Sequence, residues 1–279
     1  GLPGVTINTV AGDDIINAAE AGADQTISGV VTRAAAGDTV TVTLGGNTYT
    51  TTVQGNLSWS ISVPAADLQA LGNGDLTINA SVTNANGNTG SGTRDITIDA
   101  NLPGLRVDTV AGDDIVNSIE HGQALVITGG SSGLNAGAAL TVAINGVAYA
   151  ATVQADGSWS VGIPAASVSA WPAGPLTVEV TGQSSAGNPV SASHPFTVDL
   201  TAVAISINTV ASDDVINAAE KGTGLTLSGS TSGIESGQTV TVIFGGKTYT
   251  ASVAANGSWS VNVPAADLAT LPDGAANVQ

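Results

Sequence analysis

The stretch SWSISVPAADLQAL at residues 58–71 returns as SWSVGIPAASVSAW at 158–171 and as SWSVNVPAADLATL at 258–271. Within its first six residues, Trp59, Ile61 and Val63 alternate with serines, which is typical of a strand with one buried face. We therefore expect the indole of Trp59 to point between two sheets, with Tyr49 beside it. Pro64 ends this strand, and the following AADLQAL has the spacing of one short helical turn.

The other landmarks of the sequence also recur after 100 residues, without an insertion or deletion. The opening motif reads NTVAGDDIINAAE at 8–20, DTVAGDDIVNSIE at 108–120 and NTVASDDVINAAE at 208–220. This period predicts three domains, namely repeat 1 (1–100), repeat 2 (101–200) and repeat 3 (201–279). Gln279 corresponds to Asn79 and Glu179, so we expect repeat 3 to be truncated before its last strand and to have an open sheet edge.

Alternating residues and turn residues predict the remaining strands of each repeat. TVTVTLGGNTYTTTV from Thr39 reads as a hairpin, because the glycines at 45–46 allow the positive φ values of a two-residue turn. LTINASVT from Leu76 and TRDITIDA from Thr93, separated by NANGN, predict a final hairpin. Roughly seven short strands per repeat predict an all-β fold: tandem immunoglobulin-like antiparallel β-sandwiches arranged as an elongated rod.

The composition excludes several classes of partner. The chain has 22 acidic and 5 basic residues, a net charge of −17, which disfavours binding to nucleic acid and to anionic membranes. It has no Cys and no Met, so neither disulfides nor thiolate metal sites hold it together. The first residues, GLPGVTINTV, are not typical of a signal peptide, and no apolar run is long enough to span a membrane.

The opening motif also concentrates oxygen-bearing side chains. Asp13, Asp14, Asn17 and Glu20 lie within eight residues, and neither Lys nor Arg occurs in the motif of any repeat. Without a counterion these carboxylates would repel one another and raise one another's pKa, so the cluster indicates a hard divalent cation. Calcium fits better than magnesium because it accepts six to eight oxygens in irregular geometry. The spacing is not that of an EF-hand loop.

Strand direction suggests where this cation lies. The first strand, about Val5 to Val10, leaves the acidic loop at one pole of the sandwich, and the last strand ends at the same pole. Asp99 and Asp199 close their last strands immediately before the linkers ANLPG and LTAVA, so they are expected to complete the sites. Loops of the next repeat, around 130–137 and 183–189 in repeat 2, would add carbonyls. The predicted calcium ligands are Asp13, Asp14, Asn17, Glu20, Asp99, Asp113, Asp114, Asn117, Glu120, Asp199, Asp213, Asp214, Asn217 and Glu220.

A structural alternative remains for part of this motif. Asp13, Asn17 and Glu20 have the residue types and spacing that cap and solvate a one-turn helix. The same residues therefore indicate either a metal site or a capped helix.

The repeats resemble the bacterial immunoglobulin-like repeats of giant biofilm-associated, type I-secreted adhesins of Gram-negative bacteria. The resemblance covers the whole chain and rests on the DTVAGDDxxNxxE opening, the SWSVxVPAADL strand and the SAGN-like turn. It implies a structural stalk segment of an extracellular cell-surface adhesin for biofilm formation and cell adhesion. It also implies calcium-stiffened repeats that hold a terminal binding region away from the cell.

Other functions have less support in the sequence. We expect no enzyme activity, because His121 and His194 do not recur between repeats and are expected to be surface residues. Rows such as Thr39, Thr41 and Thr43 leave open direct binding of glycans or ice, and like modules could self-associate between cells. The expected partners are neighbouring repeats of the same chain, homophilic contacts, and a host or abiotic surface that other regions of the parent grip.

Overall fold

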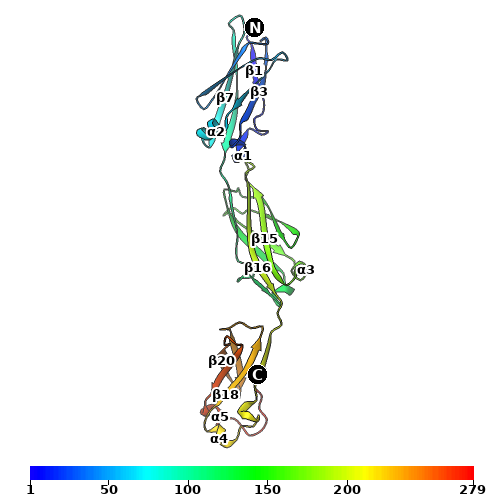
Figure 1. The fold of residues 1–279 in the computed structure, drawn as a ribbon, viewed down its shortest axis with the longest axis vertical. Coiled ribbons are helices and arrows are strands. Elements are labelled where there is room, and N and C mark those ends of the chain that lie inside the picture. The colour runs from blue at the N-terminus through cyan, green and yellow to red at the C-terminus, as the bar shows by residue number, and fades with distance from the viewer. The chain divides into compact units, whose positions relative to one another are not determined.

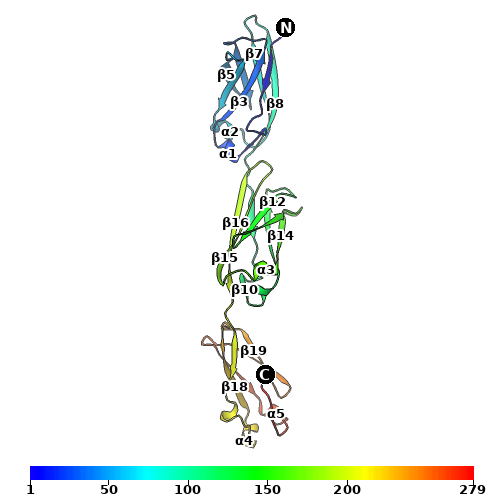
Figure 2. The same cartoon turned by 90° about the vertical axis from the view of Figure 1, so that its right-hand side faces the viewer.

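The computed structural model describes residues 1–279 and forms two sheets in each repeat. The chain divides into two compact units, Gly1–Val198 and Asp199–Gln279, so the first unit holds repeats 1 and 2. Figure 1 shows the elements of both units, and Figure 2 shows them turned by 90°. No helix of the chain has the length and apolar character that a membrane crossing requires.

Repeat 1 has a three-stranded sheet of order β1-β3-β6 and a five-stranded sheet of order β2-β8-β7-β4-β5. The predicted hairpins are confirmed, and Gly45 and Gly46 turn the first one with φ values of 56° and 89°. The first strand is shorter than expected and ends at Ile7. The elements are β1 (Gly4–Ile7), β2 (Ile15–Asn17), α1 (Ala18–Ala21), β3 (Gln25–Thr32), β4 (Thr39–Leu44), β5 (Asn47–Thr52), β6 (Ser58–Val63), α2 (Ala65–Leu71), β7 (Gly74–Thr83) and β8 (Thr89–Asp99).

One strand pair of repeat 1 departs from the expected antiparallel pattern. The short strand β2 runs parallel to the last strand β8, with Ile15 opposite Thr97 and Asn17 opposite Asp99. The acidic loop and the end of the last strand therefore do meet at one pole. Both figures place α1 at this pole and the N-terminus at the opposite end of repeat 1.

The core of repeat 1 lies between its sheets, as the alternating pattern predicted. Trp59 is only 1% exposed, and Tyr49 packs against the same core. The indole lies over Gly29 of β3, where an added Cβ would come within 2.8 Å of two ring carbons. Trp159 and Trp259 lie over Gly129 and Gly229 in the same way. Each of the three indole nitrogens is buried without a hydrogen-bond partner.

Repeat 2 has the same two sheets, of order β14-β11-β9 and β10-β16-β15-β12-β13. Its structure differs from that of repeat 1 at the first small helix, because residues Glu120–Gly122 form a 3-10 helix where repeat 1 has the α-helix α1. The elements are β9 (Gly104–Val107), β10 (Ile115–Asn117), η1 (Glu120–Gly122), β11 (Leu125–Ser132), β12 (Ala139–Ile144), β13 (Val147–Thr152), β14 (Ser158–Ile163), α3 (Ala165–Val168), β15 (Gly174–Gln183) and β16 (Pro189–Asp199).

Repeat 3 has sheets of order β17-β18-β21 and β19-β20. The edge of β19 is paired only near Phe244, with Val278. Beside it lies a groove of about 660 Å³, and Ile207 in this groove is 42% exposed, whereas its counterpart Ile7 is 7% exposed. The elements are β17 (Ala204–Ile207), η2 (Val210–Ser212), α4 (Ala218–Lys221), β18 (Leu225–Ser232), β19 (Thr239–Phe244), β20 (Lys247–Ser252), β21 (Ser258–Val263) and α5 (Ala265–Leu268).

Candidate metal centre

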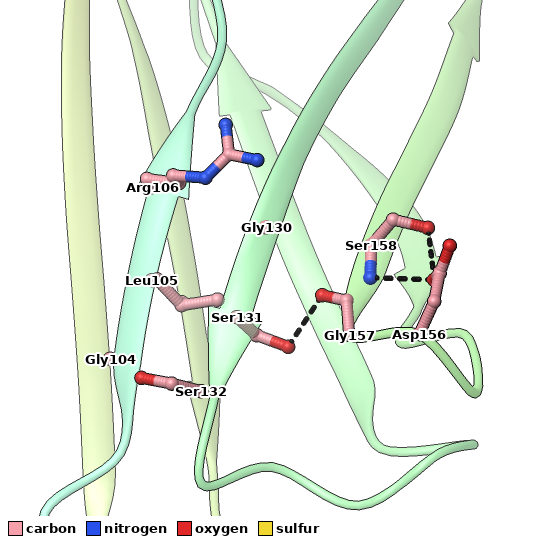
Figure 3. A pocket seen from close by; sticks show the side chains of 9 residues that line it. All are labelled: Gly104, Leu105, Arg106, Gly130, Ser131, Ser132, Asp156, Gly157 and Ser158. Atoms are coloured by element: carbon pink, nitrogen blue, oxygen red, sulfur yellow. Dashed lines mark hydrogen bonds between the residues drawn. The ribbon is translucent and has the colours of Figure 1, made fainter.

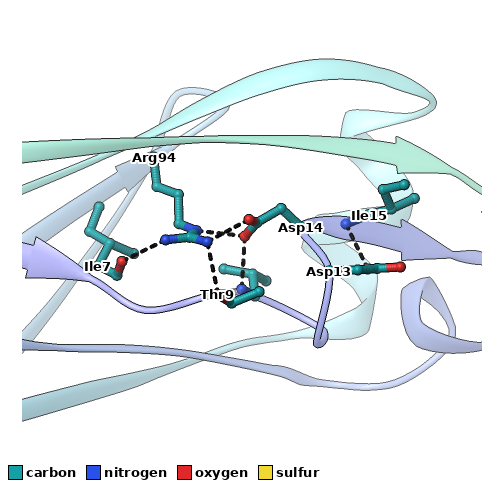
Figure 4. Close-up of polar contacts among 7 residues, drawn as sticks. Ile7, Thr9, Asp13, Asp14, Ile15 and Arg94 are labelled. Atoms are coloured by element: carbon teal, nitrogen blue, oxygen red, sulfur yellow. Dashed lines mark hydrogen bonds and ion pairs between the residues drawn. The ribbon is translucent and has the colours of Figure 1, made fainter.

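In the structure, Asp14 pairs with a basic residue that lies 80 residues later in the sequence of repeat 1. Arg94 on β8 donates from Nε and Nη2 to the two carboxylate oxygens of Asp14, at 2.6 and 2.5 Å. The same guanidinium donates to the carbonyl of Ile7 and to the hydroxyl of Thr9 (Figure 4). The hydrogen bonds from Arg94 hold the pKa of Asp14 below its usual value, and a bond from the amide of Val10 adds to this. Asp14 thus fastens the acidic loop to β8.

Repeat 2 replaces this arginine by a histidine. His194 Nε2 lies 2.7 Å from Asp114 Oδ1, and the amide of Val110 donates to the same oxygen at 2.8 Å. The bond from Val110 is the main cause, and that from His194 the second, of a lowered pKa for Asp114. His121 also has a partner, because its Nε2 lies 2.9 Å from the carbonyl oxygen of Trp171. Both histidines are half-buried and bonded within repeat 2 rather than free on its surface.

The first aspartate of the motif points elsewhere. Asp13 accepts a hydrogen bond from the amide of Ile15 at 3.0 Å, and its carboxylate is directed away from Asp14 and Arg94 (Figure 4). It lines a shallow pocket of about 420 Å³ together with Asp75 and Asp95. Asp113 and Asp213 make the same local bond to the amides of residues 115 and 215, and Asp214 accepts from the amide of Val210.

Asn17 and Glu20 form the capping box that was the alternative interpretation. Asn17 Oδ1 accepts from the amides of Ala19 and Glu20, both at 3.0 Å, and the amide of Asn17 donates to Glu20 Oε2. Asn217 and Glu220 repeat the box at the start of α4. Asn117 and Glu120 make the equivalent bonds in repeat 2. In repeat 1 the other carboxylate oxygen of Glu20 receives no hydrogen bond from the protein.

Asp99 joins Asn17 and Glu20 at the pole through the β2–β8 pair. Its Oδ1 accepts from the amide and the side-chain nitrogen of Asn101, at 3.2 and 2.8 Å. Asp199 accepts the corresponding bond from the amide of Thr201. The side chain of Thr201 first, and this amide second, lower the pKa of Asp199. The sequence-predicted ligands of repeat 1 therefore fall into two groups. Asn17, Glu20 and Asp99 lie at the pole, whereas Asp13 and Asp14 lie further back along β8.

The polar groups at the pole are chemically suited to calcium. No three His, Asp or Glu side chains converge closely enough to hold an ion by themselves. The pole instead offers the carboxylates of Glu20 and Asp99, each with one oxygen free of hydrogen bonds, and the carbonyl groups at and after the end of β8. These are hard oxygen donors of the kind calcium accepts. The amide oxygen of Asn17 already accepts two hydrogen bonds. Asp14 fits less well, since both of its oxygens are already bonded to Arg94.

The loop 183–189 of repeat 2 reaches this same pole, as expected. Asn188 Oδ1 accepts from the amide of Ala18 at 2.7 Å, and its Nδ2 donates to the carbonyls of Asp99 and Asn101. The loop 130–137 supports the turn indirectly, through a 3.3 Å bond from Asn135 to Ser185. Sequence reasoning did not single out Asn188, although the recurrence of asparagine at 88 and 188 was a usable signal.

A second depression lies on repeat 2. It measures about 450 Å³ and is lined by β9, β11 and the turn at 156–158 (Figure 3). Some of its polar groups bond to one another: Asp156 accepts twice from Ser158, and the hydroxyl of Ser131 donates to the carbonyl of Gly157. Arg106 bonds instead to Asp108, outside the depression.

Solved structures of adhesin repeats are similar to this chain. The first, from a 1.5-MDa bacterial ice-binding adhesin studied for host cell surface retention, is 37% identical over 96% of this chain and 88% of its own (TM-score 0.45). The second, from a Ca²⁺-stabilized adhesin that helps an Antarctic bacterium bind ice, is 35% identical over 99% and 71% (TM-score 0.46).

The chain belongs to the bacterial immunoglobulin-like repeats of large adhesins. This membership rests on the sequence identity, which extends over most of both chains, and not on the TM-scores. A single bacterial immunoglobulin-like domain of the M. primoryensis ice-binding adhesin is 38% identical and covers 36% of this chain and 97% of its own (TM-score 0.29). No protein-family model and no curated protein matches the chain.

Proposed function

We propose that these bacterial immunoglobulin-like repeats form a stalk segment of a cell-surface adhesin, stiffened by calcium at the repeat poles. The main support is the junction between repeats 1 and 2. Only residues 100–103 separate β8 from β9, and the turn at 184–188 bonds directly to the end of repeat 1. A connection this short, with a contact beside it, leaves little freedom for a hinge.

Calcium would be held at this pole by the carboxylates of Glu20 and Asp99, with main-chain carbonyls completing its coordination, while Asn17 caps the turn that positions Glu20. The ion would neutralise the carboxylates of Glu20 and Asp99, which have no basic partner of their own. Asp14 does not need the ion, because Arg94 already neutralises it. Repeats 2 and 3 carry the same types of residue in their capping boxes. A similar adhesin is described as Ca²⁺-stabilized, which supports the choice of ion.

The proposed location follows from the same ion. An adhesin stalk exported by a type I system to the bacterial surface would meet millimolar calcium only after export. Affinities of about 10⁻⁴ to 10⁻³ M, typical of extracellular calcium modules, would leave the sites empty in the cytoplasm and filled outside. Other regions of the parent would grip the host or abiotic surface, and biofilm formation would depend on the reach that the stalk provides.

Calorimetric titration and thermal unfolding test the calcium sites directly. We expect calcium at 100 times its Kd to stabilise the repeats by about 2.7 kcal/mol, and the double change Glu20→Gln with Asp99→Asn to remove one site. Asp156→Asn is the matched control, because repeats 1 and 3 already have asparagine at this position. A melting temperature and maximum dimension that do not change between chelator and calcium would overturn the proposal.

We propose no catalytic activity, because the two histidines are occupied by structural bonds and have no counterpart in repeat 1. Direct glycan or ice binding by the threonine row of β4 is the alternative. An ice-recrystallisation assay and a glycan array on this chain distinguish it from a stalk role, and we expect both to be negative.

A further inference from the structure

Asn188 is a polar side chain with no exposed surface at all. A buried amide group is costly unless its donors and acceptor are matched, and here they are. Its oxygen accepts from the amide of Ala18 at 2.7 Å, and its nitrogen donates to the carbonyls of Asp99 and Asn101 at 2.8 and 3.1 Å. Two of these bonds, to Ala18 and Asp99, cross from repeat 2 to repeat 1, and the third ends on Asn101 in the linker that joins them.

The three groups that Asn188 contacts are main-chain groups at the end of repeat 1 and in the linker that follows it. The capping side chain of Asn17 serves the amides of residues 19 and 20, so the amide of Ala18 has no partner within its own repeat. The carbonyls of Asp99 and Asn101 follow the end of β8. Every contact is to the main chain, so the recognition does not depend on the side chains of the preceding repeat.

The turn that carries Asn188 is built by its own sequence. Ser184 and Asn188 bond to each other through the Ser184 amide and hydroxyl, and Gly187 supplies a φ of 83° between them. Repeat 1 has the same turn, in which Asn84 bonds to Asn88 in the same two ways and Gly87 has a φ of 77°. The turn is therefore present, fully formed, at the N-terminal pole of repeat 1.

Asn88 at this pole is exposed, and its side chain has no hydrogen-bond partner. We infer that the asparagine at 88 and 188 is a head-to-tail connector that recognises main-chain groups at the C-terminal pole of another repeat of this kind. Asn188 is the occupied connector, because it is bonded to the preceding repeat, and Asn88 is the unoccupied connector. Its partner is a preceding repeat with a capped turn like that at residues 17–20 and a last strand like β8. Calcium is not required for this contact.

Amide exchange in the presence of a chelator tests the occupied connector. Asn188→Ala leaves the amide of Ala18 without an acceptor, so we expect its exchange to rise about tenfold. Asn188→Asp keeps an acceptor but cannot donate to the two carbonyls, so the alignment of repeats 1 and 2 measured by residual dipolar couplings should also change. Asn88→Ala is the matched control and should change neither quantity. Unaltered exchange of the Val178 amide would show that repeat 2 remains folded.

A longer chain tests the unoccupied connector. With a second copy of residues 101–200 placed before Gly1, Asn88 should protect the amide of Ser118 in the added copy, which is the counterpart of Ala18. Asn88→Ala should then raise the exchange of that amide about tenfold. No change in the longer chain, or an Asn188→Ala variant with the exchange and alignment of the wild type, would overturn the inference. Because chelator is present throughout, failure here is separate from failure of the calcium sites.

Discussion

Tyr49 donates its hydroxyl to a carboxylate oxygen of Asp67 at 2.7 Å, and this bond ties β5 to α2. Repeat 3 has the same bond at 2.8 Å between Tyr249 and Asp267. Repeat 2 keeps Tyr149 but has Ser167 at the position of the aspartate, and the Tyr149 hydroxyl is buried without a partner. An unpaired buried hydroxyl costs free energy that the other two repeats avoid.

Ser167→Asp should therefore stabilise repeat 2. We expect its unfolding free energy to rise by about 1 kcal/mol, the usual net value of one such hydrogen bond. Amide exchange of repeat 2 across a urea series measures this. The same change in the Tyr149→Phe background is the control, and an equal gain there would mean that the tyrosine is not the partner.

The Tyr49 bond also predicts alkaline sensitivity. Burial and the bond to Asp67 raise the pKa of Tyr49 to about 12, whereas an unfolded tyrosine has a pKa of about 10. The fold thus favours the neutral hydroxyl, so its contribution to stability is complete below about pH 10 and is lost as the pH rises through about 12. Alkaline unfolding of the wild type and Tyr49→Phe checks this. The unfolding free energy of the variant should fall less steeply than that of the wild type between about pH 10 and 12. Equal slopes for the two proteins would refute the role of Tyr49.

Gly129→Ala should strongly destabilise repeat 2. A Cβ at this position would overlap the carbonyl of Arg106 and lie 2.5 Å from a ring carbon of Trp159, so the sheet or the indole must move. We expect a loss of about 3 kcal/mol in thermal or urea unfolding. Gly162→Ala, on the adjacent strand β14, has open space around its Cβ and should cost little. Similar losses for the two variants would contradict the packing argument.

Arg94→Lys should weaken repeat 1. Lysine cannot reproduce the paired bonds to Asp14 and also reach Ile7 and Thr9, because it lacks the planar fork of arginine. We expect the unfolding free energy of repeat 1 to fall, because charge-assisted bonds of this kind are stronger than neutral ones. Arg33→Lys provides the comparison, since Arg33 makes a single long bond to the carbonyl of Leu2. Unfolding of both variants at neutral pH measures the difference, and an Arg94→Lys protein as stable as the control would disprove the role of the fork.

The sequence allowed the sandwich, the hairpins and the buried Trp59 to be predicted, because each depends on local alternation or on a turn residue. Partners that are distant in the chain were not predictable in this way. The opening motif contains no basic residue, so its carboxylates were expected to lack a counterion. Arg94, which neutralises Asp14, lies 80 residues later in the sequence. The capping box was visible as an alternative, and the structure displays it. The role of Asn188 was not predicted, because asparagine is common in turns and its partners lie in the neighbouring repeat.

The parallel pair of β2 and β8 has a mechanical consequence. β2 connects towards the N-terminus and β8 leads out of the repeat, so tension on the two ends pulls these strands in opposite directions along their length. Such a load slides the strands past each other and strains their hydrogen bonds together, whereas a hairpin pulled from its open end breaks one bond at a time. The Arg94 fork, which fixes β8 to the loop before β2, resists the same sliding movement. Repeat 1 is in this way arranged to bear traction.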